Sequence, residues 1–445
     1  MDFQPDHDFP IAGGALDGER LGGGFDIAHG LPFGGTASAW QDGQTATRPA
    51  AEIASPGIRA LDGASPRFCA LDGARGLCAL LVCLFHFKAA GPLAGSALVR
   101  GGWLCVDFFF VLSGFVIAAG WRGRLSRPAD LPVFLALRLA RVWPLHMVML
   151  MLFLAFELVG LALAGAGIMQ RPLFGPGHQP DQWLAAALLL NCFSLVGGPV
   201  WNVPAWSIAA EYWSWLIFGI VWVAGGRHRL QLVAGLAALA WLLMLADGAD
   251  LNRSWNGGLW RGLCGFLAGV LVLHLPRWQP SSWRRASLGE AAAVVLALAL
   301  IILAPAAPWN LAAPLLFALV VHTLASDAGV ISRLLARPPL QWLGLVSSAV
   351  YLVHSFVQAR LGDALDLLPR LWPGLPPLMQ HGPAGEMFGR TPLQGLMLTV
   401  LMLVLVLIAA QLARRCVEDP VRDAARRRWH PARRCAAAQT RLRFD

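Results

Sequence analysis

The architecture of the chain is set by an apolar stretch, LDGARGLCALLVCLFHFKAA, at residues 71–90. A helix needs about 20 such residues to cross the hydrocarbon core of a bilayer. Similar stretches follow near 101–121, 142–164, 205–224, 230–247, 256–275, 287–304, 309–325, 341–360 and 394–413. The sequence therefore predicts an all-α integral membrane protein with about ten transmembrane helices.

The composition supports a membrane protein and excludes several other classes. Apolar residues make up 57% of the 445 residues and charged residues only 14%. A soluble globular chain carries roughly 25% charged residues. Because too few polar side chains remain to cover a soluble surface, an ordinary cytoplasmic enzyme, a disordered protein and a collagen-like fibre are all excluded.

The net charge of +9 is almost entirely arginine, since Lys88 is the only lysine. The arginines lie between the apolar stretches and near the C-terminus, which favours a role in membrane orientation over a nucleic-acid partner. If the N-terminus is cytoplasmic and the shorter stretch at 183–198 does not span, the inward connections hold Arg122, Arg124, Arg127, Arg138, Arg141, Arg227, Arg229, Arg277, Arg284, Arg285, Arg333 and Arg337. We therefore expect ten spans, both termini in the cytoplasm, and 183–198 as a re-entrant or interfacial segment.

The rest of the chain divides around these spans. Residues 1–66 have no apolar run and predict a disordered cytoplasmic extension. Residues 67–415 form the predicted transmembrane domain, with a Pro- and Gly-rich external loop at 361–393, and residues 416–445 form a basic cytoplasmic tail. The eight cysteines show no C-x-x-C pair and no Cys/His ligand spacing, so we expect neither a disulfide framework nor a metal site.

Ionisable side chains inside the predicted spans are candidates for function because they are costly to bury in a membrane. Arg75 and His86 are separated by close to three helical turns, so they share one stripe of the first span. Four more ionisable groups lie in other spans at about the depth of His86, namely Asp107, Glu211, Arg261 and His354. Each taken singly fits a buried structural pair. Together they favour a polar active cavity, in which a carboxylate could hold the tautomer of His86.

Arg138 and Arg141 lie at i and i+3 on one helical face, just before Pro144. One interpretation is anchoring at the inner membrane surface. The other is a clamp for phosphate, because arginine presents a bidentate fork to phosphate oxygens. The spacing alone leaves both open.

Hydroxyl groups share helical faces with these ionisable residues. Ser207 and Glu211 lie at i and i+4, and Ser347, Tyr351 and His354 lie at i, i+4 and i+7. Ser347, Tyr351 and His354 could form hydrogen bonds between helices or line a substrate site.

Five segments, in order, resemble the motifs of the membrane acyltransferase-3 family, which comprises bacterial O-acyltransferases of surface polysaccharides and their relatives. They are LDGARG at 71–76 with FHF at 85–87, VDFFFVLSGF at 106–115, RLARVWP at 138–144, WSIAAE at 206–211, and LG at 343–344 with Ser347 and YLVH at 351–354. A weaker match runs through Arg261, Phe266 and Gly269. The chain departs from the usual pattern at Tyr212-Trp213 and at Ser347-Ser348.

The resemblance implies transfer of an acyl group, usually acetyl, from acyl-coenzyme A to a hydroxyl of an envelope polysaccharide, a lipid-linked sugar or a related glycoside. It also implies a location in the bacterial inner membrane. Acyl-CoA is then a donor substrate, and no cofactor is bound permanently. The expected partners are this donor, a carbohydrate or glycolipid acceptor and membrane lipid.

The resemblance also implies roles for single residues. The family's catalytic first-helix histidine corresponds to His86, and its donor-binding arginines correspond to Arg75, Arg138 and Arg141. We expect Asp107 or Glu211 to orient His86, which acts as a general base or takes the acyl group itself. The weaker candidates for the oxyanion or the substrate are Ser113, Ser207, Arg261, Ser347, Tyr351 and His354.

Two other functions could use the same buried charges. A transporter or flippase would use them as a substrate or proton pathway. Inverted halves with matching broken helices would support that function, and the sequence shows no such repeat. A non-catalytic partner in polysaccharide export would keep the fold and bind coenzyme A without turnover.

Overall fold

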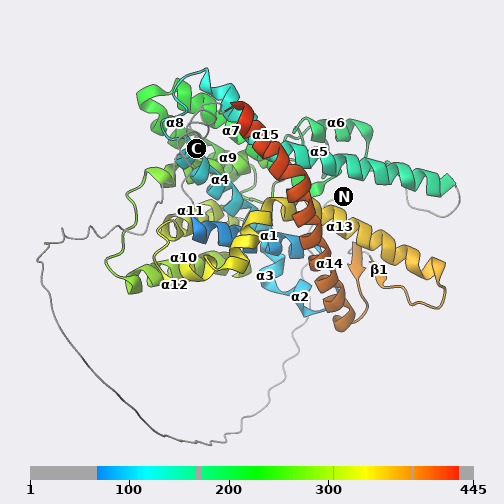
Figure 1. The fold of residues 1–445 in the computed structure, drawn as a ribbon. Helices are drawn as coiled ribbons and strands as arrows, with labels where there is room; N and C mark the ends of the chain where they lie inside the picture. The colour runs from blue at the N-terminus through cyan, green and yellow to red at the C-terminus, as the bar shows by residue number, and fades with distance from the viewer. Residues whose placement is uncertain (1–67, 166–172, 304, 383–384, 430–445) are drawn as a thin grey trace, which may run out of the picture. The chain divides into compact units, whose positions relative to one another are not determined.

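The computed structural model describes residues 68–165, 173–303, 305–382 and 385–429. The predicted extension at 1–66 lies outside these residues. Within them, helices and one short β-hairpin make up the fold (Figure 1). The helices are α1 (Cys69–His86), α2 (Pro92–Gly95), α3 (Ala97–Arg100), α4 (Cys105–Trp121), α5 (Asp130–Gly165), α6 (Pro180–Ala187), α7 (Trp206–Ala224), α8 (Arg229–Ala246), α9 (Gly258–His274), α10 (Trp283–Leu303), α11 (Ala313–Leu324), α12 (Val330–Leu335), α13 (Pro338–Leu371), α14 (Pro392–Ala413) and α15 (Asp419–Trp429).

The apolar helices correspond to the stretches that the sequence predicts. In the described part of the chain, 8 helical segments are long and apolar enough to cross a membrane. Two more, Gly258–His274 and Trp309–Leu324, are apolar but shorter, and both pack against α4. Residues 183–198 form no spanning helix, because α6 ends at Ala187 and turns follow it. The prediction of an all-α membrane protein is confirmed.

Two helices run beyond the stretches that predicted them. α5 begins at Asp130, so Arg138 and Arg141 lie inside it. α13 continues to Leu371, through the first part of the segment predicted as an external loop. Leu361, Leu365 and Leu368 continue its apolar face at helical spacing. An apolar stretch of about 20 residues shows where the chain crosses the bilayer, but it does not show where the helix begins or ends.

The chain also remains helical after α14. A π-helical turn at Arg414–Glu418 leads from α14 into α15, and the two helices form one bent run in Figure 1. α15 packs against α5. The first part of the predicted basic tail is therefore a packed helix, while residues 430–445 lie outside the described residues.

A hairpin holds the segment that follows α1. It consists of β1 (Met379–Gly382) and β2 (Gly385–Phe388), which pair antiparallel with Met379 opposite Phe388. The Phe388 ring stacks on Phe87, with 4.2 Å between the centroids. The backbone N–H of Ala90 donates to the carbonyl of Phe388 at 2.8 Å. These contacts fix the end of α1 where His86 lies.

α1 lies near the centre of the fold and packs along α13 (Figure 1). Gly76 allows the two backbones to meet, because a Cβ there would lie 2.8 Å from the backbone nitrogen of Gly344. Gly344 in turn faces the backbone carbonyl of Asp72, which a Cβ on Gly344 would overlap. Small residues at such contacts let membrane helices pack closely. The contact sets the distance between the polar residues of α1 and those of α13.

We expect Gly76→Val to push α1 away from α13. Overpacking of a close contact costs about 1–3 kcal/mol, so the detergent-solubilised protein should show a lower Tm and a lower folded yield. Gly235→Val on α8 is the matched control, since no heavy atom lies within 4 Å of a Cβ at that position. Equal Tm values for the two variants would contradict the close packing of α1 on α13.

Candidate active site

A cavity of about 140 Å³ lies between α1, α4, α5, α7 and α13, with Glu418 of the π-helical turn in its wall. One water needs only about 10–15 Å³ by this kind of measure, so the cavity admits a larger ligand. Eight of the candidate residues line it, namely Arg75, Ser113, Arg138, Arg141, Ser207, Glu211, Ser347 and Tyr351. The other four, His86, Asp107, Arg261 and His354, lie outside its lining.

Arg75 is held by α13. Its Nε donates to Ser347 Oγ at 2.9 Å, and its Nη2 donates to the carbonyl of Gly344 at 2.7 Å. Asp72, one turn earlier on α1, forms an ion pair with the same Nη2 at 3.3 Å. The close α1–α13 packing thus places the guanidinium in the cavity wall and fixes its direction.

Arg138 and Arg141 bring further positive charge to the cavity from α5. Glu211 of α7 accepts a short hydrogen bond from Ser113, and the arginines attract its carboxylate. Nε of Arg138 is buried and has no hydrogen-bond partner among the described residues. Arg141 lines the cavity and is exposed. Spare guanidinium donors in a cavity wall suit an anionic ligand.

His86 and His354 form a pair outside this cavity. Nδ1 of His86 lies 2.9 Å from the carbonyl oxygen of Val82, and Nδ1 of His354 lies 3.2 Å from that of Val350. Because a carbonyl can only accept, each Nδ1 carries the proton in these bonds. Nε2 of His354 then directs its lone pair to Nδ1 of His86, 3.3 Å away. This assignment leaves Nε2 of His86 able to accept a proton.

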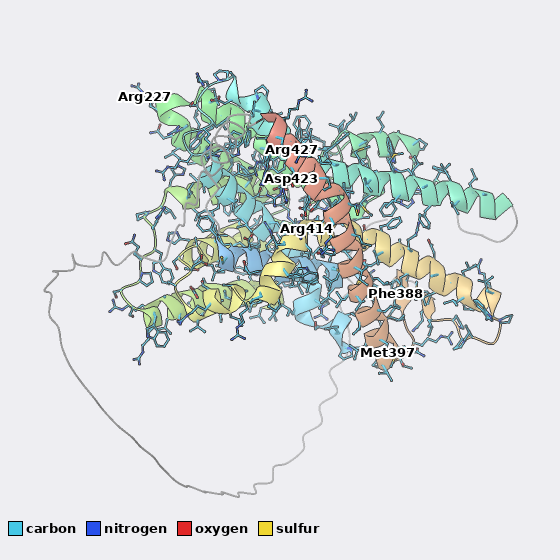
Figure 2. The ribbon with its side chains drawn as sticks, viewed as in Figure 1. Arg227, Phe388, Met397, Arg414, Asp423 and Arg427 are labelled. Carbon is cyan, nitrogen blue, oxygen red and sulfur yellow. The ribbon has the colours of Figure 1, made fainter. Side chains whose placement is uncertain are left out.

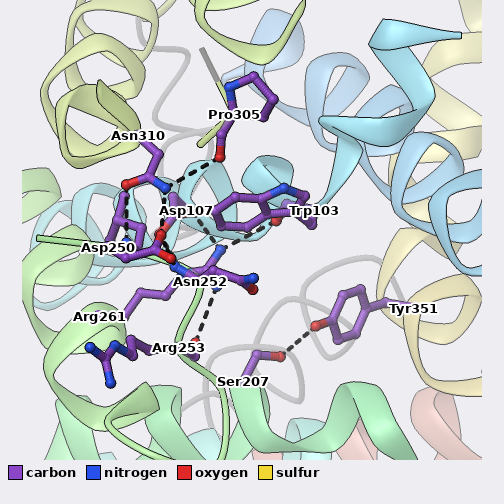
Figure 3. A network of polar contacts seen from close by, with 11 residues as sticks. Trp103, Asp107, Ser207, Asp250, Asn252, Arg253, Arg261, Pro305, Asn310 and Tyr351 are labelled. Atoms are coloured by element: carbon purple, nitrogen blue, oxygen red, sulfur yellow. Dashed lines mark hydrogen bonds and ion pairs between the residues drawn. The ribbon is translucent and has the colours of Figure 1, made fainter. Parts of the chain in front are cut away.

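Tyr351 lies between the cavity and the histidine pair. It lines the cavity, and its ring centroid is 5.9 Å from that of His354. Its hydroxyl is 2.7 Å from Ser207 Oγ, a contact drawn in Figure 3. The Tyr351 side chain therefore borders the arginine-lined cavity and also lies near His354 of the histidine pair.

The structure corrects the expected partner of His86. Asp107 instead forms a bidentate ion pair with Arg261, with 2.9 Å from Oδ1 to Nε and 2.7 Å from Oδ2 to Nη2. Both side chains are buried. Arg261 also donates to the carbonyls of Trp103 and Arg253, as Figure 3 shows.

The ionisable groups thus form three separate sets rather than one polar cavity at one depth. These sets are the Asp107–Arg261 pair, the histidine pair and the arginine-lined cavity with Glu211. Position along a span gives the depth of a residue in the membrane. It does not give the direction around the helix axis, and that direction decides which neighbour a side chain meets.

Two polar cavity residues, Ser348 and Glu418, were not among the sequence candidates. Glu418 falls in the segment predicted as a tail, outside the apolar window that defined the last span. A signal for it was present, because the acidic residues Glu418 and Asp419 interrupt an arginine-rich stretch that continues the helix.

A family model for an acyltransferase domain matches residues 69–415, which include all the cavity residues except Glu418. The chain belongs to the acyltransferase-3 family. This is the family that the sequence motifs resemble, and it is a family of membrane proteins, in agreement with the apolar helices.

Curated relatives include named acyltransferases. Peptidoglycan O-acetyltransferase OatA of Listeria monocytogenes is 25% identical over 333 residues, which are 68% of this chain and 51% of that protein. Protein 2 in the picA locus of Rhizobium radiobacter is 32% identical over 193 residues, or 40% of this chain and 94% of the relative. Acyltransferase MdmB of Streptomyces mycarofaciens is 30% identical over 161 residues, or 34% and 38%. This family member thus spans about half the length of the Listeria protein. No solved structure matches it.

The Asp107–Arg261 pair predicts a large effect on stability. Asp107→Asn leaves the Arg261 guanidinium buried without its counterion, which costs about 3–5 kcal/mol, so we expect a lower Tm and little folded protein. The double variant Asp107→Leu/Arg261→Met should recover most of the loss, because apolar residues can replace a buried ion pair. An inactive Asp107→Asn protein with the wild-type Tm would instead place Asp107 in the chemistry.

Proposed function

We propose that this protein transfers an acyl group, acetyl in the simplest case, from acyl-coenzyme A to a hydroxyl of an envelope polysaccharide, a lipid-linked sugar or a related glycoside. The proposal rests on an arginine-lined cavity that reaches Tyr351. The Tyr351 ring lies near His354, and His354 contacts His86, whose Nε2 can accept a proton. Membership of an acyltransferase family and a relative named as a peptidoglycan O-acetyltransferase support it.

The arginine end of the cavity suits the phosphates of the donor. Arg75, Arg138 and Arg141 offer guanidinium groups, which bind phosphate oxygens in a bidentate manner. In our proposal this end faces the cytoplasm, in agreement with the positive-inside distribution of arginines in a bacterial inner membrane. The thioester arm then extends along the cavity toward Tyr351 and the histidine pair.

His86 is the proposed general base. Its Nε2 takes the proton of the acceptor hydroxyl as the hydroxyl oxygen attacks the thioester carbonyl. The new C–O bond replaces the C–S bond, and the departing thiolate of coenzyme A takes the proton back from His86. Tyr351 is the proposed donor to the oxyanion that forms on the carbonyl, because the hydroxyl proton of Ser113 is already donated to Glu211.

His354 takes the orienting role that the sequence suggested for a carboxylate. Its Nε2 faces Nδ1–H of His86 at 3.3 Å, so it fixes the tautomer and stabilises the imidazolium that forms during transfer. The Val82 carbonyl shares this task at 2.9 Å. Two neutral acceptors then hold the histidine in a part of the membrane where a carboxylate would be costly.

The direct test supplies labelled acetyl-CoA and an envelope glycan extract to membranes that contain the wild type or His86→Ala at matched expression. We expect label in the glycan with the wild type and a loss of roughly 100-fold or more with the variant, because a positioned general base contributes about 10²–10⁴-fold. His322→Ala on α11, outside the cavity lining, is the control for loss of a histidine.

The other outcomes of this test are informative. Label with both proteins would keep the acyltransferase and move the chemistry away from His86. No label with either protein, together with no binding of coenzyme A, would favour the transporter or flippase.

His354→Ala should lower kcat roughly 10- to 100-fold, which is less than the effect of removing the base itself. The KM for acetyl-CoA should stay near the wild-type value, because His354 lies outside the cavity that would hold the donor. Steady-state kinetics in detergent would separate the two constants. A rise in KM with an unchanged kcat would assign His354 to substrate binding and would contradict its proposed role in orienting His86.

A further inference from the structure

Glu418 reaches the cavity because of the π-helical turn at Arg414–Glu418. The buried face of α14 runs through Met402, Val406 and Ala410. In an uninterrupted α-helix, Val417 would lie two turns after Ala410 and on the same face. A π-helical turn takes more residues per revolution, so Glu418 returns to that face instead. Accordingly, Glu418 is buried and Val417 is only half-buried.

The turn is fixed by ion pairs at the start of α15. Asp419 contacts Nη2 of Arg414 at 3.3 Å and Nη2 of Arg422 at 2.7 Å. α15 lies against α5, the helix that carries Arg138 and Arg141. Figure 2 shows Arg414, Asp423 and Arg427 along this run of helix. The position of Glu418 is therefore built into the packing of two helices.

Glu418 is bonded to a neutral group although it lies among arginines. Ser348 Oγ donates to Glu418 Oε1 at 3.1 Å. Arg141 and Arg75 attract the carboxylate across the cavity. Among the described residues, neither arginine forms an ion pair with it within 4.0 Å. Because Arg75 is already bonded to Ser347, Gly344 and Asp72, this gap leaves chiefly Arg141 available to another anion.

The charges of the cavity wall favour such an anion. Arg75, Arg138 and Arg141 supply three positive charges, and Glu211 and Glu418 supply two negative ones when ionised. Asp72, outside the cavity lining, already pairs with Arg75. A phosphate group would therefore meet mainly the positive charge of Arg138 and Arg141, and Nε of Arg138 has no hydrogen-bond partner among the described residues. It would also meet the like charge of Glu418, which weakens its binding.

We propose that Glu418 is part of the donor site, where its carboxylate acts as a built-in counterion that balances the arginines until a phosphate-bearing donor replaces it. This inference rests on the proposed acyl-CoA donor and extends the site to the π-helical turn between α14 and α15. Glu418 sets the affinity for the donor, and a moderate affinity lets coenzyme A leave after transfer. It takes no part in the chemical step, because the histidine pair lies beyond Tyr351.

The test compares Glu418→Gln with the wild type, using the full chain in detergent at low ionic strength and coenzyme A as the probe. The Ser348 hydroxyl can still donate to the Gln oxygen, so the variant should fold. We expect coenzyme A to bind roughly three- to tenfold more tightly, as when one like charge leaves a partly buried site. The KM for acetyl-CoA should fall by a similar factor without a rise in kcat. The gain in affinity for coenzyme A should become smaller as salt is added, because salt screens the charges.

Glu386→Gln is the matched control, because it removes one negative charge from an exposed position on the hairpin. It should bind coenzyme A as the wild type does. Unchanged or weaker binding by folded Glu418→Gln would overturn the inference while leaving the acyl-CoA donor in place. A second measurement compares how the wild type and Glu418→Gln bind phosphatidylglycerol in nanodiscs. If the variant changed only this lipid binding, and not the binding of coenzyme A, the inference would be overturned and the arginines would be assigned to a lipid headgroup. No coenzyme A binding by the wild type would overturn the proposed function itself, and the inference with it.

Discussion

The close packing of α1 on α13 is the constraint on which the site depends. Gly76 and Gly344 let the two backbones meet, and no larger residue fits between them without a shift of one helix. At one end of this contact α13 holds Arg75 through Ser347. At the other end the same helix pair sets His86 beside His354. The distance between Arg75 and the histidine pair is thus fixed by one helix–helix interface, which a hairpin secures at the end of α1.

Charges buried in the bundle are kept apart, and each set has its own means of compensation. Asp107 and Arg261 neutralise each other in a bidentate pair, a geometry that limits the cost of burial. The histidine pair avoids that cost by remaining neutral and bonding to backbone carbonyls. The cavity set brings three arginines together with Glu211 and Glu418. Under the proposed function, this separation would let the protein hold an anion at one end without disturbing a neutral base at the other. Tyr351 lines the cavity and lies 5.9 Å from His354 between ring centroids.

The position of α15 links the end of the chain to this charge balance. Arginines at the end of a membrane protein ordinarily suggest anchoring at the inner surface. Here the helix carrying them packs against α5, and the π-helical turn directs one carboxylate into the cavity. The same segment therefore supplies surface charge and a wall of the site.

The sequence by itself determined the membrane fold, because spanning length and the lack of polar surface leave a helical bundle as the solution. It also determined the family, and it named Arg75, Arg138, Arg141 and Glu211, which the structure brings to one cavity. Tertiary structure alone decided the partners: Arg261 for Asp107, His354 for His86, and Ser348 for Glu418. Helical period and hydropathy give the depth and the face of each residue on its own helix. The rotation of one helix against another depends on side-chain packing between segments far apart in the chain, and a local pattern contains no information about it.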